Sequence, residues 1–149
     1  AWIATGGAEV ARVFMTHDGG DSWVAVDTPL TDPSPTSGIF SIAFRDGFHG
    51  VAVGGDYARP DLDHANSAWT DDGGRTWHRP AVPPAGYRSG VSWVPGTDTI
   101  LCVGPGGVDV SRDGGRTWEP LPSSGYHAIR LVCGGGFSSG SGGRLAALR

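Results

Sequence analysis

One eight-residue phrase occurs three times in this chain, and its spacing constrains the fold more than any other feature. It is THDGGDSW at 16–23, TDDGGRTW at 70–77 and SRDGGRTW at 111–118. The shared aspartates, Asp18, Asp72 and Asp113, are separated by 54 and 41 positions. The longer interval contains an extra polar stretch, GGDYARPDLDHANSAW at 54–69. Periods near forty residues are typical of β-propeller blades, each built from four short strands.

Each copy of the phrase is predicted to be a hairpin turn between two strands. The Asp-Gly-Gly core favours positive φ angles, which glycine adopts without strain. We expect the aspartate to accept hydrogen bonds from main-chain N–H groups two or three residues later, with the preceding hydroxyl adding another. The tryptophan is expected to bury against the sheet. The predicted structural residues are Thr16, Asp18, Gly20, Trp23, Thr70, Asp72, Gly74, Trp77, Ser111, Asp113, Gly115 and Trp118.

The composition agrees with an all-β fold of many short strands joined by turns. The chain has 149 residues with 26 glycines and 11 prolines, dispersed among β-branched and aromatic residues. We predict a single partial propeller domain over 1–149, of four-stranded antiparallel blades, with blade segments at about 1–30, 38–80, 88–121 and 126–149. About three and a half blades cannot close a ring, so we expect further blades, in a ring of seven, or self-association.

Charge and cysteine content exclude some classes of function. The net charge is −4 and all eleven basic residues are arginine, so no broad basic surface for nucleic acid and no lysine nucleophile are expected. No apolar run is long enough to insert into a membrane. The two cysteines, Cys102 and Cys133, are predicted to be buried free thiols. A disulfide between neighbouring blades is the alternative, and it requires an oxidising compartment.

The loops opposite the repeated turns are predicted to form the functional face. In a four-stranded blade the 1–2 and 3–4 turns lie on one face, and the 2–3 and 4–1 loops lie on the other. The second face receives segments 29–38, 54–67, 79–90 and 119–128. Arginine beside tyrosine is typical of recognition surfaces. The candidate partner-binding residues are Asp56, Tyr57, Arg59, Tyr87, Arg88, Tyr126 and His127.

Three sharper site hypotheses fall on the same loops. Asp61, Asp63 and His64 are weak candidates for a metal site, because no EF-hand pattern surrounds them. Asp56 with Asp61 or Asp63 is a weak candidate for a hydrolytic carboxylate pair. The third hypothesis is binding of a carboxylate or phosphate by arginines, namely Arg59, Arg88 and Arg79.

No catalytic residue and no cofactor site is assigned from the sequence. The glycine runs VGGD, VGPGGVD and GSGGR do not fit the dinucleotide fingerprint, which follows a strand and opens a helix. The five histidines are scattered, and those at 17 and 78 are expected at the surface beside the repeated turns.

The repeated phrase resembles the Asp-box (BNR) repeat, S/T-x-D-x-G-x-T/S-W, at all three positions, with Ser22 where the other copies have threonine. The flanking run GIFSIAFRDGFHGVAVGGDY, then AWTDDGGRTW and GYRSGVSWVPG, is most similar to photosystem II assembly factors of the Ycf48/HCF136 type. That resemblance covers essentially the whole chain and is strongest over 38–120. It implies a non-catalytic scaffold that grips a protein partner, in an extracytoplasmic compartment (periplasmic, secreted or lumenal). The alternative is a fragment of a sialidase or other glycoside hydrolase whose catalytic carboxylates lie partly outside this chain.

Overall fold

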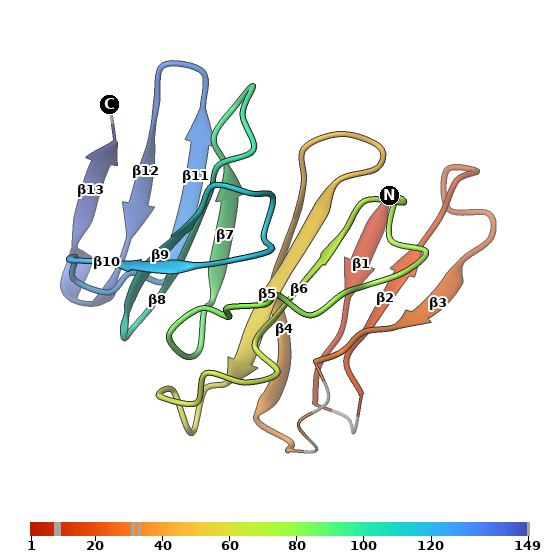
Figure 1. The fold of residues 1–149 in the computed structure, drawn as a ribbon, viewed down its shortest axis with the longest axis horizontal. Helices are drawn as coiled ribbons and strands as arrows, with labels where there is room; N and C mark the ends of the chain where they lie inside the picture. The colour runs from red at the N-terminus through yellow and green to blue at the C-terminus, as the bar shows by residue number, and fades with distance from the viewer. Residues whose placement is uncertain (8–9, 31, 33, 149) are drawn as a thin grey trace.

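The computed structural model describes residues 1–7, 10–30, 32 and 34–148 (Figure 1). Within them the regular structure is β, apart from one short 3-10 turn at Ser141–Gly143. The all-β prediction is therefore confirmed. Positions 31 and 33 of the predicted loop at 29–38, and position 149 of the last predicted blade segment, lie outside the described residues. The described part holds no helix with the length and apolar character needed to span a membrane.

In the described residues, thirteen strands form four antiparallel sheets that follow one another along the chain. The first sheet contains β1 (Trp2–Ala4), β2 (Arg12–Met15) and β3 (Val24–Asp27). The second contains β4 (Ser37–Phe44), β5 (Gly50–Asp56) and β6 (Ser67–Thr70). The third contains β7 (Gly90–Trp93), β8 (Ile100–Gly104), β9 (Gly107–Ser111) and β10 (Glu119–Leu121). The fourth contains β11 (Ala128–Val132), β12 (Gly135–Ser139) and β13 (Leu145–Leu148).

A propeller blade has four strands, and the fourth strand is the outermost. Among the second, third and fourth sheets, the third is the one in which the described residues form this fourth strand. There β10 pairs with β9 over three residues. In the second sheet the corresponding segment is reduced to one antiparallel bridge between Trp69 and His78. Proline at 80 and again at 83 and 84 explains the short pairing, because proline has no N–H to donate to a ladder.

The four sheets lie side by side in chain order, with the first and the fourth sheet at opposite ends of the molecule (Figure 1). The first strands of successive sheets are neighbours, since β4 contacts β7 and β7 contacts β11. Each of these strands is also an edge of its own sheet. This arrangement is that of consecutive propeller blades whose innermost strands face a common axis.

The hydrophobic core lies between sheets, and β5 shows how one strand serves two interfaces. Ala52 packs into the cluster between the first and second sheets, which also contains Val13 and Trp77. Val51 and Val53 point to the other side, into the cluster between the second and third sheets. Successive side chains of a strand point to opposite faces, so a strand buried on both sides has an unbroken apolar sequence.

Serine side chains accept hydrogen bonds from main-chain N–H groups of the inner edge strands. Ser41 Oγ on β4 accepts a hydrogen bond from Val91 N on β7 at 3.2 Å, and Ser92 Oγ accepts one from Leu131 N on β11 at 3.0 Å. Edge strands otherwise present unpaired main-chain groups that attract other strands. The two serines thus join neighbouring sheets and block pairing at these positions.

The two cysteines differ in exposure. Both are free thiols, as predicted, but only Cys102 is buried. Burial raises the pKa of the Cys102 thiol, so this side chain behaves as a small apolar group. The prediction that Cys133 is buried is wrong, because it lies just after β11 at the turn into β12, where the chain is exposed.

Candidate functional site

The repeated phrase forms the same hydrogen-bonded turn three times, best illustrated by the third copy. Asp113 Oδ1 accepts hydrogen bonds from Ser111 Oγ, from Arg116 N and from Thr117 N at 2.8, 3.0 and 2.9 Å. Its other oxygen accepts one from Thr117 Oγ1 at 2.6 Å. Ser111 Oγ in turn accepts a bond from Gly115 N at 2.8 Å. The main-chain donors are three and four residues after the aspartate, not two or three as predicted.

Hydrogen bonding keeps these aspartates ionised. Burial by itself would raise the pKa of Asp72, but hydrogen bonds from Thr76 and Thr70 outweigh it and lower the pKa to about 2. The pKa values of Asp18 and Asp113 are lowered for the same kind of reason. A carboxylate that accepts several fixed N–H and O–H donors holds its charge inside the turn. The arrangement is structural, because both carboxylate oxygens of the aspartate accept hydrogen bonds from groups of the same turn and so close the hairpin.

The tryptophans that end the three phrases are not equally buried. Trp77 and Trp118 are 8 % and 2 % exposed, whereas Trp23 is 40 % exposed. Trp77 packs between the first and second sheets, and Trp118 packs between the second and third. Each therefore rests on the preceding sheet. Burial of Trp23 was predicted wrongly, because no earlier sheet lies against the first one in the part of the chain that the structure describes.

On the opposite face, Arg59 joins two aspartates from different loops. Its Nε donates to Asp56 Oδ2 at 2.8 Å, and its Nη2 donates to Asp32 Oδ2 at 2.7 Å. Asp56 also accepts bonds from Thr36 Oγ1 at 2.5 Å and from Ala58 N at 2.9 Å. The hydroxyl of Thr36 is the main reason why the pKa of Asp56 falls to about 2. This network fixes the start of the 54–67 loop against the 32–37 segment.

Three aromatic rings meet above this network. Phe40 contacts Tyr57 and Tyr87 edge to face, with ring centroids 5.9 and 5.0 Å apart and both interplanar angles at 89°. Phe40 is the extra residue of a β-bulge, since Ile39 pairs with Gly54 while Ser41 pairs with Val53. A bulge redirects the side chain of the inserted residue. Phe40 is 43 % exposed and Tyr57 54 %, while Tyr87 is buried beneath them.

Arg88 was predicted on the recognition surface, and this prediction is wrong. The side chain is 2 % exposed, and its guanidinium lies 2.5 Å from the carboxylate of Asp109. Two further guanidinium nitrogens donate to the carbonyl oxygens of Tyr87 and Ala85. Asp109 is itself 1 % exposed, on the central part of β9. Arg88 therefore forms an internal ion pair and is buried away from the surface that a partner could contact.

Asp56 and Tyr87 are also too buried to contact a partner directly, since they are 3 % and 8 % exposed. Of the predicted residues around the aromatic rings, Tyr57 and Arg59 remain at the surface, and Phe40 joins them. Phe40 was missed by sequence reasoning because it lies in an apolar strand, IFSIAF, where period-2 alternation does not reveal a bulge.

Tyr126 and His127 belong to a separate contact group at the start of the fourth sheet. Tyr126 N donates to the Gly104 carbonyl at 2.9 Å, and the Tyr126 ring lies 5.6 Å from the Arg144 guanidinium. His127 Nε2 is 2.7 Å from Ser141 Oγ. Among the described residues, no hydrogen bond or ring contact joins either side chain to Phe40 or Tyr57.

The predicted acidic metal candidates do not form a ligand cluster. Asp61, Asp63 and His64 are all exposed. No group of three or more histidine, cysteine or carboxylate side chains in the described ranges is placed to hold a metal ion. Asp63 and His64 line a small recess of about 130 Å³ together with Arg79.

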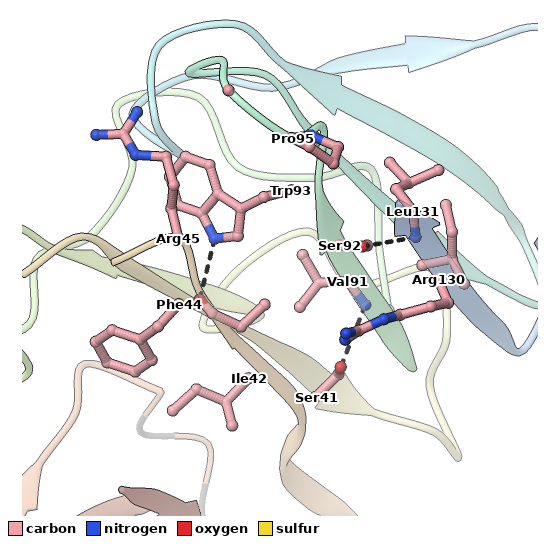
Figure 2. Close-up of a pocket in the computed structure, with 13 residues that line it drawn as sticks. Ser41, Ile42, Phe44, Arg45, Val91, Ser92, Trp93, Pro95, Arg130 and Leu131 are labelled. Carbon is pink, nitrogen blue, oxygen red and sulfur yellow. Dashed lines mark hydrogen bonds between the residues drawn. The ribbon is translucent and has the colours of Figure 1, made fainter. Parts of the chain in front are cut away.

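A larger groove of about 600 Å³ follows the innermost strands β4, β7 and β11 (Figure 2). Its two charged lining residues are Arg45 and Arg130. Arg45 lies over the Trp93 ring, 5.1 Å from the centroid, and is paired with Asp98. Arg130 extends from β11 towards Ser41, whose hydroxyl accepts a hydrogen bond from Val91 N (Figure 2). Because Arg45 is held by Asp98, Arg130 supplies the positive charge of this groove that no carboxylate among the described residues pairs with.

Comparison with protein families matches the BNR/Asp-box repeat at residues 68–79 and 109–120, which contain the second and third copies of the phrase. Comparison with solved structures finds one described as "YCF48 bound to D1 peptide", with a TM-score of 0.58 and 24 % sequence identity. The similarity covers 76 % of this chain and 37 % of that chain. The chain therefore spans less than half of that protein. No curated protein sequence gives a significant match. The predicted Asp-box repeats are confirmed, and the fold is that of Ycf48-like propeller blades.

Proposed function

We propose that this chain is part of a non-catalytic binding scaffold that holds a protein partner on the loop face of its blades. The contact surface is centred on Phe40, Tyr57 and the exposed edge of Arg59. The observation that carries the proposal is the pair of exposed aromatic rings supported from below by Tyr87. Aromatic residues and arginine dominate the binding energy of protein interfaces.

The supporting structure beneath these rings is rigid, which favours binding. Asp56 is bound by Thr36, Ala58 and Arg59, so the loop that carries Tyr57 is fixed at its base. Tyr87 N donates to the Pro60 carbonyl at 2.8 Å and joins that loop to the next one. A surface that is already ordered loses little conformational entropy when a partner binds.

Similarity to a solved propeller supports the same kind of function. That structure is described as bound to a peptide, and it shares the blade architecture with this chain. Propeller faces are used widely for recognition because loops of several blades converge there. We infer that peptide or protein recognition is the function of this fold here too.

Site-specific photo-crosslinking tests the proposal in cells that produce the whole protein. A benzophenone amino acid at Tyr57 is expected to give a discrete adduct with one protein, identified by mass spectrometry. The same group at His17, an exposed residue in an Asp-box turn, is the control on the other face. Phe40→Ala is expected to reduce the adduct at 57. Equal adducts from both positions, or no adduct at 57, would contradict the proposed face.

A further inference from the structure

The loop segments that carry the aromatic rings have a negative net charge, although arginines lie close to the tyrosines in their sequence. The described loop residues 32, 34–40, 54–67 and 79–90, together with Asp109, contain five aspartates and three arginines. Arg88 is neutralised by Asp109, and Arg59 is held by two carboxylates. Asp61 and Asp63 are exposed. Over these segments, which include the loop that carries Tyr57, the loop face therefore has an excess of two negative charges.

Arg59 is poorly placed to receive an anion from a partner. Two of its nitrogens already donate to Asp56 and Asp32 at 2.8 and 2.7 Å. A carboxylate or phosphate approaching it meets both of these aspartates. The carboxylate- or phosphate-binding role predicted for Arg59 and Arg88 therefore conflicts with the contacts that both side chains make.

We propose that the partner segment bound at Phe40 and Tyr57 carries a lysine or arginine side chain, recognised by the ring faces and by the surrounding carboxylates. This inference rests on the proposed function and names the chemistry of its partner. A cation over an aromatic face is attracted by the ring quadrupole, and nearby negative charge adds to that attraction. Excess charge of opposite sign also accelerates association and discriminates against acidic partners.

The position of Asp61 supports this recognition mode. Leu62 N donates to the Arg59 carbonyl at 3.1 Å, so the chain turns back after Arg59. Pro60, at the start of this turn, is bonded to Tyr87 N. The exposed Asp61 at the tip is therefore held beside the loop that carries Tyr87. A basic side chain lying on the rings has a carboxylate within the same surface.

A different surface of the molecule is suited to anions. In the groove along β4, β7 and β11, Arg45 is held by Asp98, whereas Arg130 is a charged lining residue with no ion pair among the described residues. An acidic partner is expected to select that groove and not the aromatic rings. The sign of the partner's charge thus distinguishes the two surfaces.

Phage display of random twelve-residue peptides tests the inference with the whole chain as bait. Clones that bind the wild type but not Tyr57→Ala are collected and sequenced. We expect enrichment of lysine and arginine and depletion of aspartate and glutamate in these clones. Replacing the enriched lysine by norleucine, which has a similar length and no charge, is expected to weaken binding about tenfold, the upper part of the range for one cation–π contact. Phe48→Ala is the matched control, because Phe48 is 61 % exposed in the turn between β4 and β5, on the other face.

The outcomes separate this inference from the proposed function. Peptides that depend on Tyr57 but lack basic residues, or are enriched in acidic ones, would overturn the inference and leave the binding surface in place. Equal affinity of the lysine and norleucine peptides would also overturn it. If no selected peptide depends on Tyr57, the loop face is not the binding surface and both proposals fail. Equal loss of binding in Phe48→Ala and Tyr57→Ala would indicate general destabilisation and contradict a site at the rings.

Discussion

Replacing Arg88 by methionine is expected to destabilise the fold more than any surface substitution. Arg88 and Asp109 are 2 % and 1 % exposed, and Arg88 also donates to the carbonyls of Tyr87 and Ala85. Methionine has a similar length but leaves the Asp109 charge buried without its partner. Breaking one side of a buried ion pair costs about 3–5 kcal/mol. For a domain of this size, a loss of that order lowers Tm by roughly 10 °C.

Urea denaturation followed by tryptophan fluorescence measures this loss, because Trp77 and Trp118 are buried in the two core clusters. The double variant Arg88→Met, Asp109→Leu removes both charges and is expected to recover a large part of the free energy of unfolding. Arg130→Met is the matched control. Arg130 is exposed on β11, so its replacement is expected to change stability by less than about 0.5 kcal/mol.

Two results would refute the reasoning. A loss below about 1 kcal/mol for Arg88→Met would show that Asp109 is solvated or protonated without cost. A double variant as unstable as the single one would show that Arg88 contributes through packing and its carbonyl contacts, and not through the buried charge.

Three further measurements follow from the structure. Asp56 and Asp72 have folded-state pKa values of about 2 against the ordinary 3.8, so the stability that these carboxylates contribute is complete above about pH 4 and is lost as the pH falls towards 2. The urea midpoint is expected to fall over that pH window, and to fall less steeply in the Asp72→Asn variant. An equal fall in the wild type and in the variant would contradict this origin. Trp118→Ala is expected to lower the free energy of unfolding by about 3–5 kcal/mol and Trp23→Ala by less than about 1 kcal/mol, because the exposed fractions of the two rings are 2 % and 40 %. Similar losses for the two variants in thermal unfolding would mean that Trp23 is covered in solution. A maleimide is expected to label Cys133 in the native protein and Cys102 only after unfolding, as followed by mass spectrometry; rapid labelling of Cys102 would contradict its burial.

The features that the sequence predicted correctly are those determined by local chemistry. The Asp-box turn needs an aspartate, two glycines and a hydroxyl residue within eight positions, and the side-chain hydrogen bonds of the aspartate and of the hydroxyl residue close inside that segment. The spacing at which this turn recurs along the sequence then predicts the blade architecture. The exposure of Trp23 was not predictable in this way, because burial of that ring depends on a neighbouring sheet and not on its own turn.

The errors at the loop face have a common physical cause. Arg59 and Arg88 both lie within two residues of a tyrosine in the sequence, yet one is half-exposed and the other is buried against Asp109. The signal that separates them is in a different segment: GVDVS, at 107–111, places one aspartate in a strand that is otherwise apolar or small. A lone carboxylate in a buried strand requires a cationic partner, since an unpaired buried charge is too costly.

The use of arginine inside the blades also explains why its abundance says little about the partner. Arg45, Arg59 and Arg88 are each held by an aspartate. A guanidinium that already binds a carboxylate contributes position and stiffness and has little charge to offer to a ligand. What remains available at the loop face is the pair of exposed rings and the surplus aspartates. The side chains that are not used in internal ion pairs therefore determine what this surface binds. Exposed aromatic rings and unpaired carboxylates favour a cationic group.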